Sequence, residues 1–83
     1  MTSAEMLAGV KKALGIVGEY QDETLTQYIE EVTDYLRDAG VKPAHITVGI
    51  VSRGVSDLWN YGGSYGKLSP YFMQRAAQLS YKI

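Results

Sequence analysis

The sequence predicts an all-α fold, a small bundle of about four helices in a single domain over residues 1–83. Apolar residues recur at steps of three and four, which places them on one face of a helix. Residue types that begin or end helices flank these apolar segments. We therefore expect helices over about residues 3–14, 22–39, 46–61 and 70–81, with a glycine-rich loop between the last two.

The first two helices have clear boundary signals. Thr2 and Glu5 have the spacing of a capping box, and Gly15 is typical of a helix end. Asp22 is the expected N-cap of the second helix, and Gly40 is expected to end it. The core-facing stripe of the second helix has steps of four, three and four: Leu25, Ile29, Val32 and Leu36.

The third helix follows a connector in which Pro43 suits the first position of a helical turn. Its valines and isoleucines favour a strand by composition, but the apolar positions do not alternate, so we predict a helix. Arg53 and Asp57 are expected to pair on its outer face. Its predicted core residues are Ile50, Val51, Val55, Leu58 and Trp59. Trp59 can also be interpreted as the anchor of a subunit interface.

The last helix is expected to begin with Ser69 as N-cap and Pro70 at the first position. Phe72 is the main predicted core residue of this helix. The other residues expected to face inward are Met73, Ala76, Ala77 and Leu79. Small side chains at two of these positions would let another helix approach closely.

Charge is unevenly distributed along the chain. Residues 1–40 contain eight acidic and three basic residues, whereas residues 41–83 contain five basic residues and the single acid Asp57. Such asymmetry can steer association between unlike faces of identical subunits. The alternative interpretation is a chance distribution over ordinary solvated helix faces.

Composition excludes several classes of function. The chain has no cysteine and one histidine, His45, which leaves neither a thiolate nor a histidine-rich metal site. No segment approaches the roughly 20 apolar residues of a membrane span, and no secretory leader is evident, so we expect a protein of the cytoplasm. No serine has a base at a recognisable spacing, and we expect no enzyme activity, no cofactor and no metal.

The segment from Gly62 to Leu68 contains glycines and a lysine, as phosphate-binding loops do. Gly62 and Gly66 are one residue too close for that motif, and Leu68 stands where Ser or Thr must follow the lysine. Two interpretations stay open: a mobile loop, or a loop that becomes ordered against a partner. Tyrosines around it favour the second, since tyrosine is enriched at interfaces. The candidate interface residues are Tyr61, Tyr65, Lys67, Tyr71, Arg75 and Tyr81.

Three segments carry a resemblance to a known family: VKKALGI over 10–16, YQDETLTQYIEEVTDYLRDAGV over 20–41, and GIVSRGVSDLWNYGGSYGKLSPYFMQR over 49–75. With them, the chain over about residues 6–80 resembles the small head–tail connector proteins of tailed bacteriophages and of prophages in Gram-positive bacteria. These proteins are also described as DNA-packaging or head-completion adaptors.

The resemblance implies an all-helical virion assembly protein with no enzymatic role. Family members form rings of about twelve subunits beneath the portal at the capsid vertex, where a tail or stopper protein docks. It implies location at the head–tail junction, assembly in the host cytoplasm, passage of DNA through the ring and no membrane association. The 62–68 loop and residues 81–83 become candidate contacts with neighbours. The chain is shorter at its C-terminus than larger relatives, which leaves the portal-docking segment open.

The alternative from another class is a small helical DNA-binding regulator, since four short helices can contain a helix-turn-helix. Against it, the connection between the last two helices is long, and the last helix carries only Arg75 and Lys82. The slightly acidic chain also argues against a strong affinity for phosphates.

Overall fold

The computed structural model describes residues 2–60 and 68–82. Their element order is α1 (Ser3–Leu14), α2 (Asp22–Asp38), a 3-10 turn (Pro43–His45), α3 (Val48–Asn60) and α4 (Pro70–Ser80), with no strand in this part of the chain. The predicted all-helical, four-helix fold is confirmed. The glycine-rich segment 62–67 lies outside the described residues.

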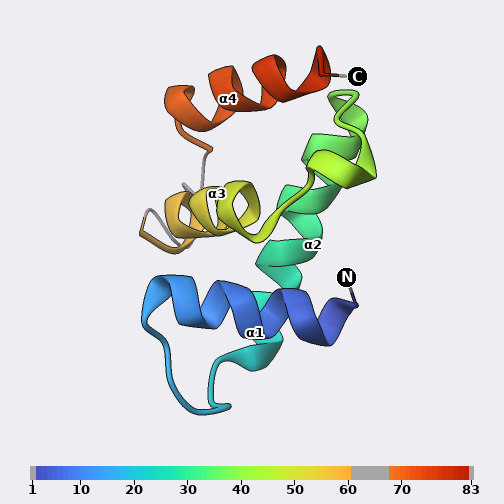
Figure 1. Ribbon diagram of the computed structural model, residues 1–83. Helices are drawn as coiled ribbons and strands as arrows, with labels where there is room; N and C mark the ends of the chain where they lie inside the picture. Colours follow the sequence, from blue (N-terminus) through green and yellow to red (C-terminus); the bar gives the residue numbers. More distant parts are fainter. Residues whose placement is uncertain (1, 61–67, 83) are drawn as a thin grey trace.

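The helices form two layers. Figure 1 shows α1, α3 and α4 stacked one above another, with α2 crossing behind them. The described residues span only 18 Å in their thinnest direction, which is about two helix diameters. The middle helix, α3, contacts all three others.

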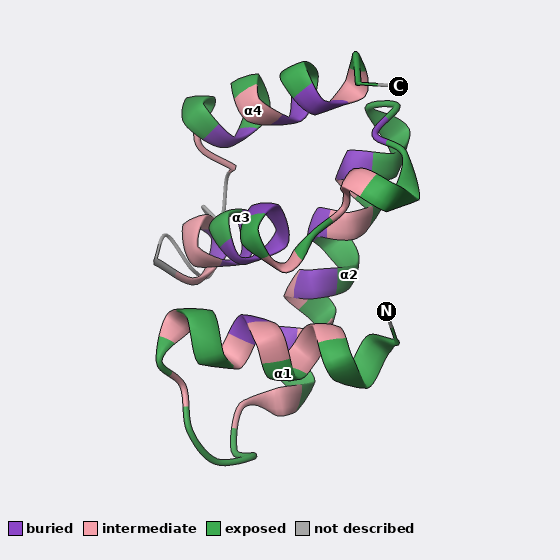
Figure 2. Ribbon diagram, viewed as in Figure 1, coloured by how far each residue is buried: buried purple, intermediate pink, exposed green. Residues whose placement is uncertain are grey.

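The central position of α3 explains its burial. Its buried residues cover more than half of its circumference: Ile50, Val51, Ser52, Gly54, Val55 and Leu58. An amphipathic surface helix would bury a narrower stripe. Figure 2 shows buried residues on the sides of α2, α3 and α4 that face one another.

The predicted core residues lie where the sequence places them, with one exception. Nine of the ten are buried, and the tenth, Trp59, is half-buried. The indole of Trp59 packs edge-to-face on Tyr28, with ring centroids 6.0 Å apart. In α4, Phe72, Ala76 and Leu79 are buried. The expectation that Met73 and Ala77 face inward was wrong, since both are exposed.

Gly54 sets the separation of three helices. A Cβ atom at this position would lie 2.7 Å from Cε1 of Phe72 in α4 and 2.7 Å from Cγ1 of Val32 in α2. Carbon atoms in contact are normally about 3.5–4.0 Å apart. The missing side chain of Gly54 therefore makes room for the ring of Phe72.

The helix ends are formed by the local chemistry of the chain. The capping box of α1 is present, with Thr2 N–H donating to Glu5 Oε1 (2.9 Å) and Glu5 N–H donating to Thr2 Oγ1 (3.1 Å). The end of α2 is a Schellman motif, in which Gly40 has a φ of 90°. In this motif Gly40 N–H donates to the Arg37 carbonyl and Val41 N–H to the Leu36 carbonyl.

Some predicted boundaries shift by one or two residues. Asp22 was expected as the N-cap of α2, but the cap is Gln21 and Asp22 is the first helical residue. The third helix begins at Val48 instead of Ile46, because the Thr47 carbonyl and hydroxyl accept the first free N–H groups. The second and last helices each end one residue earlier than predicted, with Ala39 and Tyr81 as C-caps.

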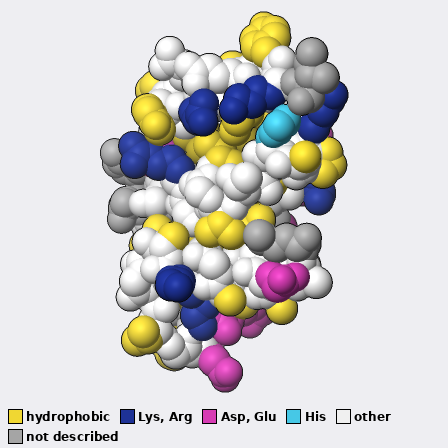
Figure 3. Space-filling model, in the orientation of Figure 1, with side chains coloured by type: hydrophobic (Ala, Val, Ile, Leu, Met, Phe, Trp, Pro, Cys, Tyr) yellow, Lys and Arg dark blue, Asp and Glu magenta, His cyan; other side chains and the backbone are white. Residues whose placement is uncertain are grey.

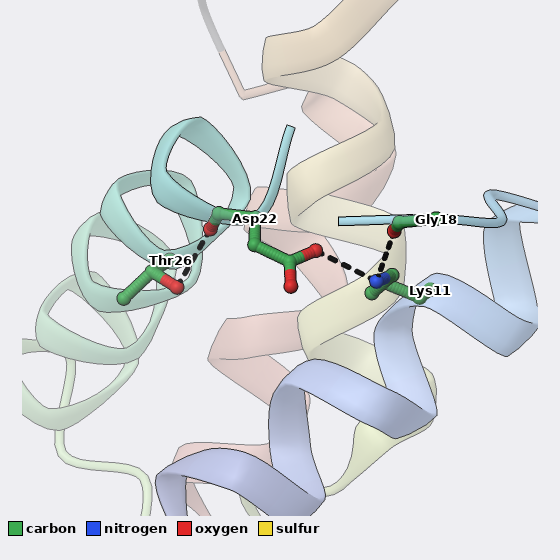
Figure 4. Close-up of polar contacts among 4 residues, drawn as sticks. All are labelled: Lys11, Gly18, Asp22 and Thr26. Atoms are coloured by element: carbon green, nitrogen blue, oxygen red, sulfur yellow. Dashed lines mark hydrogen bonds and ion pairs between the residues drawn. The ribbon is translucent and has the colours of Figure 1, made fainter. Parts of the chain in front are cut away.

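Asp22 is a helical residue because its carboxylate is bound elsewhere. Its Oδ1 lies 2.7 Å from Lys11 Nζ, and the same ammonium donates to the Gly18 carbonyl (Figure 4). The Thr26 hydroxyl donates to the Asp22 carbonyl at 2.8 Å. Both charged side chains are largely buried, with exposed fractions of 17% and 31%. The ion pair joins the end of α1 to the start of α2.

Candidate functional site

A cleft between α3 and α4 is lined mainly by basic and aromatic residues. It has a volume of about 420 Å³. Its lining comprises His45, Thr47, Gly49, Ile50, Arg53, Tyr71, Arg75, Leu79 and Lys82. We call it the basic cleft, because three of these residues are lysine or arginine, one is histidine and none is acidic.

Helix geometry brings the cationic side chains of the basic cleft together. Tyr71 and Arg75 are one turn apart in α4, and Lys82 continues the same stripe just beyond the end of the helix. Arg53 comes from α3, and His45 from the 3-10 turn before it. Figure 3 shows the dark-blue side chains around a hydrophobic hollow in the upper half of the molecule, beside the histidine.

The guanidinium groups of the basic cleft have neutral partners. Arg53 lies over the ring of Tyr71, 4.6 Å from the ring centroid, in a cation–π contact. Arg75 Nη1 donates to Gln78 Oε1 at 3.0 Å. Within the described ranges, neither arginine forms an ion pair. Their charge is therefore available to an anionic partner.

The predicted pair between Arg53 and Asp57 was wrong. Oδ2 of Asp57 instead accepts from the backbone N–H of Ser69 (3.1 Å) and from its hydroxyl (2.7 Å). The Ser69 hydroxyl in turn accepts from Phe72 N–H (3.1 Å), as the N-cap of α4 should. This chain of hydrogen bonds ties the start of α4 to α3. Because the Asp57 carboxylate is bound to Ser69, the single acid of residues 41–83 does not neutralise the cations of the basic cleft.

Three exposed hydrophobic side chains lie on α4 or directly after it. The five large hydrophobic side chains with the greatest exposure in the described structure include Tyr71 (57%), Met73 (42%) and Tyr81 (86%). The other two, Val17 and Tyr20, lie in the connection between α1 and α2. Tyr71 and Met73 are two positions apart in α4, which places their side chains on different faces of the helix.

A second concave surface lies between α1 and α2, and we call it the acidic groove. It has a volume of about 540 Å³. Met6, Leu7, Ile29 and Ile46 give it an apolar floor, and Glu30 and Asp34 of α2 lie along it. Its one basic residue, Arg37, is 3.6 Å from Asp34 in an exposed pair.

The acidic groove borders a long acidic stripe. Glu23, Glu30, Asp34 and Asp38 lie at steps of seven, four and four along α2, on the side opposite its buried residues. On the face drawn in Figure 3, acidic side chains lie in the lower half of the molecule, where some basic side chains lie as well. The charge asymmetry of the sequence is therefore an asymmetry between surfaces.

The structure places two of the six sequence-predicted interface residues in the basic cleft, Tyr71 and Arg75. Tyr81 is highly exposed but does not line it. Tyr61, Tyr65 and Lys67 lie outside the described residues. Sequence reasoning did not assign His45, Arg53 or Lys82 to this site. The step of seven from Arg75 to Lys82 was a signal that could have identified the last of these.

The described residues were compared with the requirements of a metal site and of a membrane span. They contain no group of three or more histidine, cysteine, aspartate or glutamate side chains placed to hold a metal ion. Ser52 is the one buried polar residue among them, and its Oγ has no hydrogen-bond partner there. No described helix is long and apolar enough to cross a membrane.

Comparisons with protein families, with curated proteins and with solved structures found no match for this chain. The fold and the two surfaces define its class: a small all-helical protein with oppositely charged concave surfaces.

Proposed function

We propose that the protein is a structural adaptor that assembles through contacts between unlike faces of identical subunits. One observation carries the proposal: the basic cleft and the acidic groove are separate surfaces of opposite charge, formed by different helix pairs. Opposite charges attract across an interface and fix its orientation. A contact between two different surfaces produces a ring if the rotation between subunits closes.

The family resemblance indicates where in a virion this proposed adaptor would act. As a head–tail connector, it assembles as a ring of about twelve subunits on the portal of a phage capsid, after DNA packaging. The ring extends the DNA channel and offers a docking surface to a tail or stopper protein. The virion vertex is then its final location, and the host cytoplasm is where it assembles.

Sedimentation velocity, with and without portal protein, tests the proposal. We expect self-association or portal-bound oligomers at low salt and weaker association at about 1 M salt, where the Debye length falls to about 3 Å. A protein that stays monomeric at every concentration, both alone and with portal protein, would refute the adaptor.

The cationic lining of the basic cleft also favours a second candidate function, a DNA-binding regulator. Fluorescence polarisation with random duplex DNA at low salt separates the two functions. A regulator would bind tightly, and its affinity would fall steeply with salt, because each phosphate contact releases a counterion.

A further inference from the structure

The acidic groove and the basic cleft each present two side chains that are one helical turn apart. Glu30 and Asp34 are four residues apart on α2, so their side chains are neighbours about 5–6 Å apart along one face. Tyr71 and Arg75 have the same separation on α4. Where α4 of one copy crosses α2 of another, the pair Tyr71 and Arg75 can therefore face the pair Glu30 and Asp34.

The two surfaces also match in polarity. The apolar floor of the acidic groove includes Met6 and Leu7 of α1, which are half-buried, and Ile29 of α2. The side chain of Tyr71 is 57% exposed at the rim of the basic cleft, with one ring face against Arg53. Tyrosine at an interface combines an apolar ring with a hydroxyl that can remain hydrated.

The basic cleft is not suited to pair with itself. Two basic clefts brought together would oppose Arg53, Arg75 and Lys82 with their own copies, whereas the acidic groove contains Glu30, Asp34 and the single base Arg37. Like charges placed across an interface cost several kcal/mol. The favourable pairing is the unlike one.

From this match we propose that α4, which forms one wall of the basic cleft of one copy, docks in the acidic groove of a second copy. Arg75 and Lys82 then lie against Glu30 and Asp34, and the Tyr71 ring covers the apolar floor. The contact is heterologous, so every subunit in a chain of contacts uses one surface of each kind. This inference rests on the proposed self-association and names the two surfaces that produce it.

Charge reversal tests the pairing. We expect Arg75→Glu and Glu30→Lys each to raise the dissociation constant of self-association by roughly tenfold or more, since each puts like charges in contact. The double variant Arg75→Glu/Glu30→Lys reverses both surfaces together, and we expect it to associate far more tightly than either single variant. Sedimentation equilibrium at low salt provides the constants, and circular dichroism establishes that each variant is folded.

Matched controls carry the same change in charge at other positions. Lys12→Glu reverses an exposed base of α1, and Glu19→Lys an exposed acid before α2, and neither residue lines either surface. The pairing is overturned if the cleft and groove variants weaken association no more than these controls, or if the double variant associates no better than the single ones.

The outcomes also separate this inference from the proposed function. A wild-type protein that is monomeric alone and with portal protein refutes the adaptor itself. A wild-type protein that self-associates, with variants that behave like the controls, refutes only the pairing of these surfaces. The pairing is also overturned if Arg75→Glu abolishes binding to random duplex DNA and leaves self-association unchanged, because nucleic acid is then the occupant of the cleft.

Discussion

The packing at Gly54 predicts that adding a single methyl group there will destabilise the protein. In Gly54→Ala the new Cβ meets Phe72 Cε1 and Val32 Cγ1, each at 2.7 Å. Overpacking of this kind costs about 1–3 kcal/mol. Alanine has a helix propensity about 1 kcal/mol better than glycine, which offsets part of the cost. Where the overpacking cost is near the upper end of its range, the net loss is about 1–2 kcal/mol.

For a domain of this size, 1 kcal/mol corresponds to roughly 4–8 °C in melting temperature. We therefore expect Gly54→Ala to melt roughly 5–15 °C below the wild type, as measured by circular dichroism at 222 nm and by urea titration.

Gly49→Ala is the matched control in the same helix. At Gly49 a Cβ would meet only Thr47 Oγ1, at an ordinary contact distance of 3.8 Å. We expect this variant to be unchanged or up to about 1 kcal/mol more stable, because only the propensity effect remains. Equal stability of the Gly54 and Gly49 variants would refute the close approach of α2, α3 and α4.

Three further predictions concern the polar contacts. Lys11→Met removes the partner of a largely buried carboxylate and should cost about 1–3 kcal/mol in urea titrations, whereas Lys12→Met, at an exposed position, should cost little. Asp57→Ala should lower the hydrogen-exchange protection of α4 amides by roughly tenfold or more, because the hydrogen bonds from Ser69 to Asp57 that join α4 to α3 are lost. Equal protection in the variant and the wild type would contradict a role for Asp57 in holding α4. The backbone N–H of Thr2, and secondly its hydroxyl, lower the pKa of Glu5 from its ordinary value of 4.5. The ionised carboxylate therefore stabilises α1 above that value, and the effect disappears as the pH falls through the lowered pKa; amide exchange in the first turn should show this step in the wild type and not in Glu5→Gln.

The sequence was sufficient to predict the helices and most of the core. Stripes such as Leu25 to Leu36 have one clear face, and caps such as Thr2 and Ser69 act within one turn of the chain. Local signals of this kind do not depend on which helices become neighbours. The boundary errors at Asp22 and Ile46 arose at two specific contacts: the Asp22 carboxylate pairs with Lys11 of α1, and the Ile46 N–H donates to the Pro43 carbonyl of the 3-10 turn.

The candidate site was less predictable because it depends on tertiary neighbours. Arg53 and Asp57 have the spacing of a helical ion pair, yet one lies over Tyr71 and the other binds Ser69, both from the α4 end of the chain. The spacing of residues in the sequence cannot show that the contacts with Tyr71 and Ser69 form in place of an ion pair between Arg53 and Asp57. His45 reaches the cleft only because the 3-10 turn sets the start of α3 beside α4.

Mixing two singly blocked variants tests the central claim, head-to-tail association, most directly. Arg75→Glu keeps an intact acidic groove, and Glu30→Lys keeps an intact basic cleft. We expect each alone to associate much more weakly than the wild type at low salt in sedimentation velocity. A mixture should form larger oligomers in which the two variants alternate, because the intact cleft pairs with the intact groove and the reversed cleft pairs with the reversed groove. Two variants that stay monomeric on mixing, or that continue to form large oligomers on their own, would contradict the account.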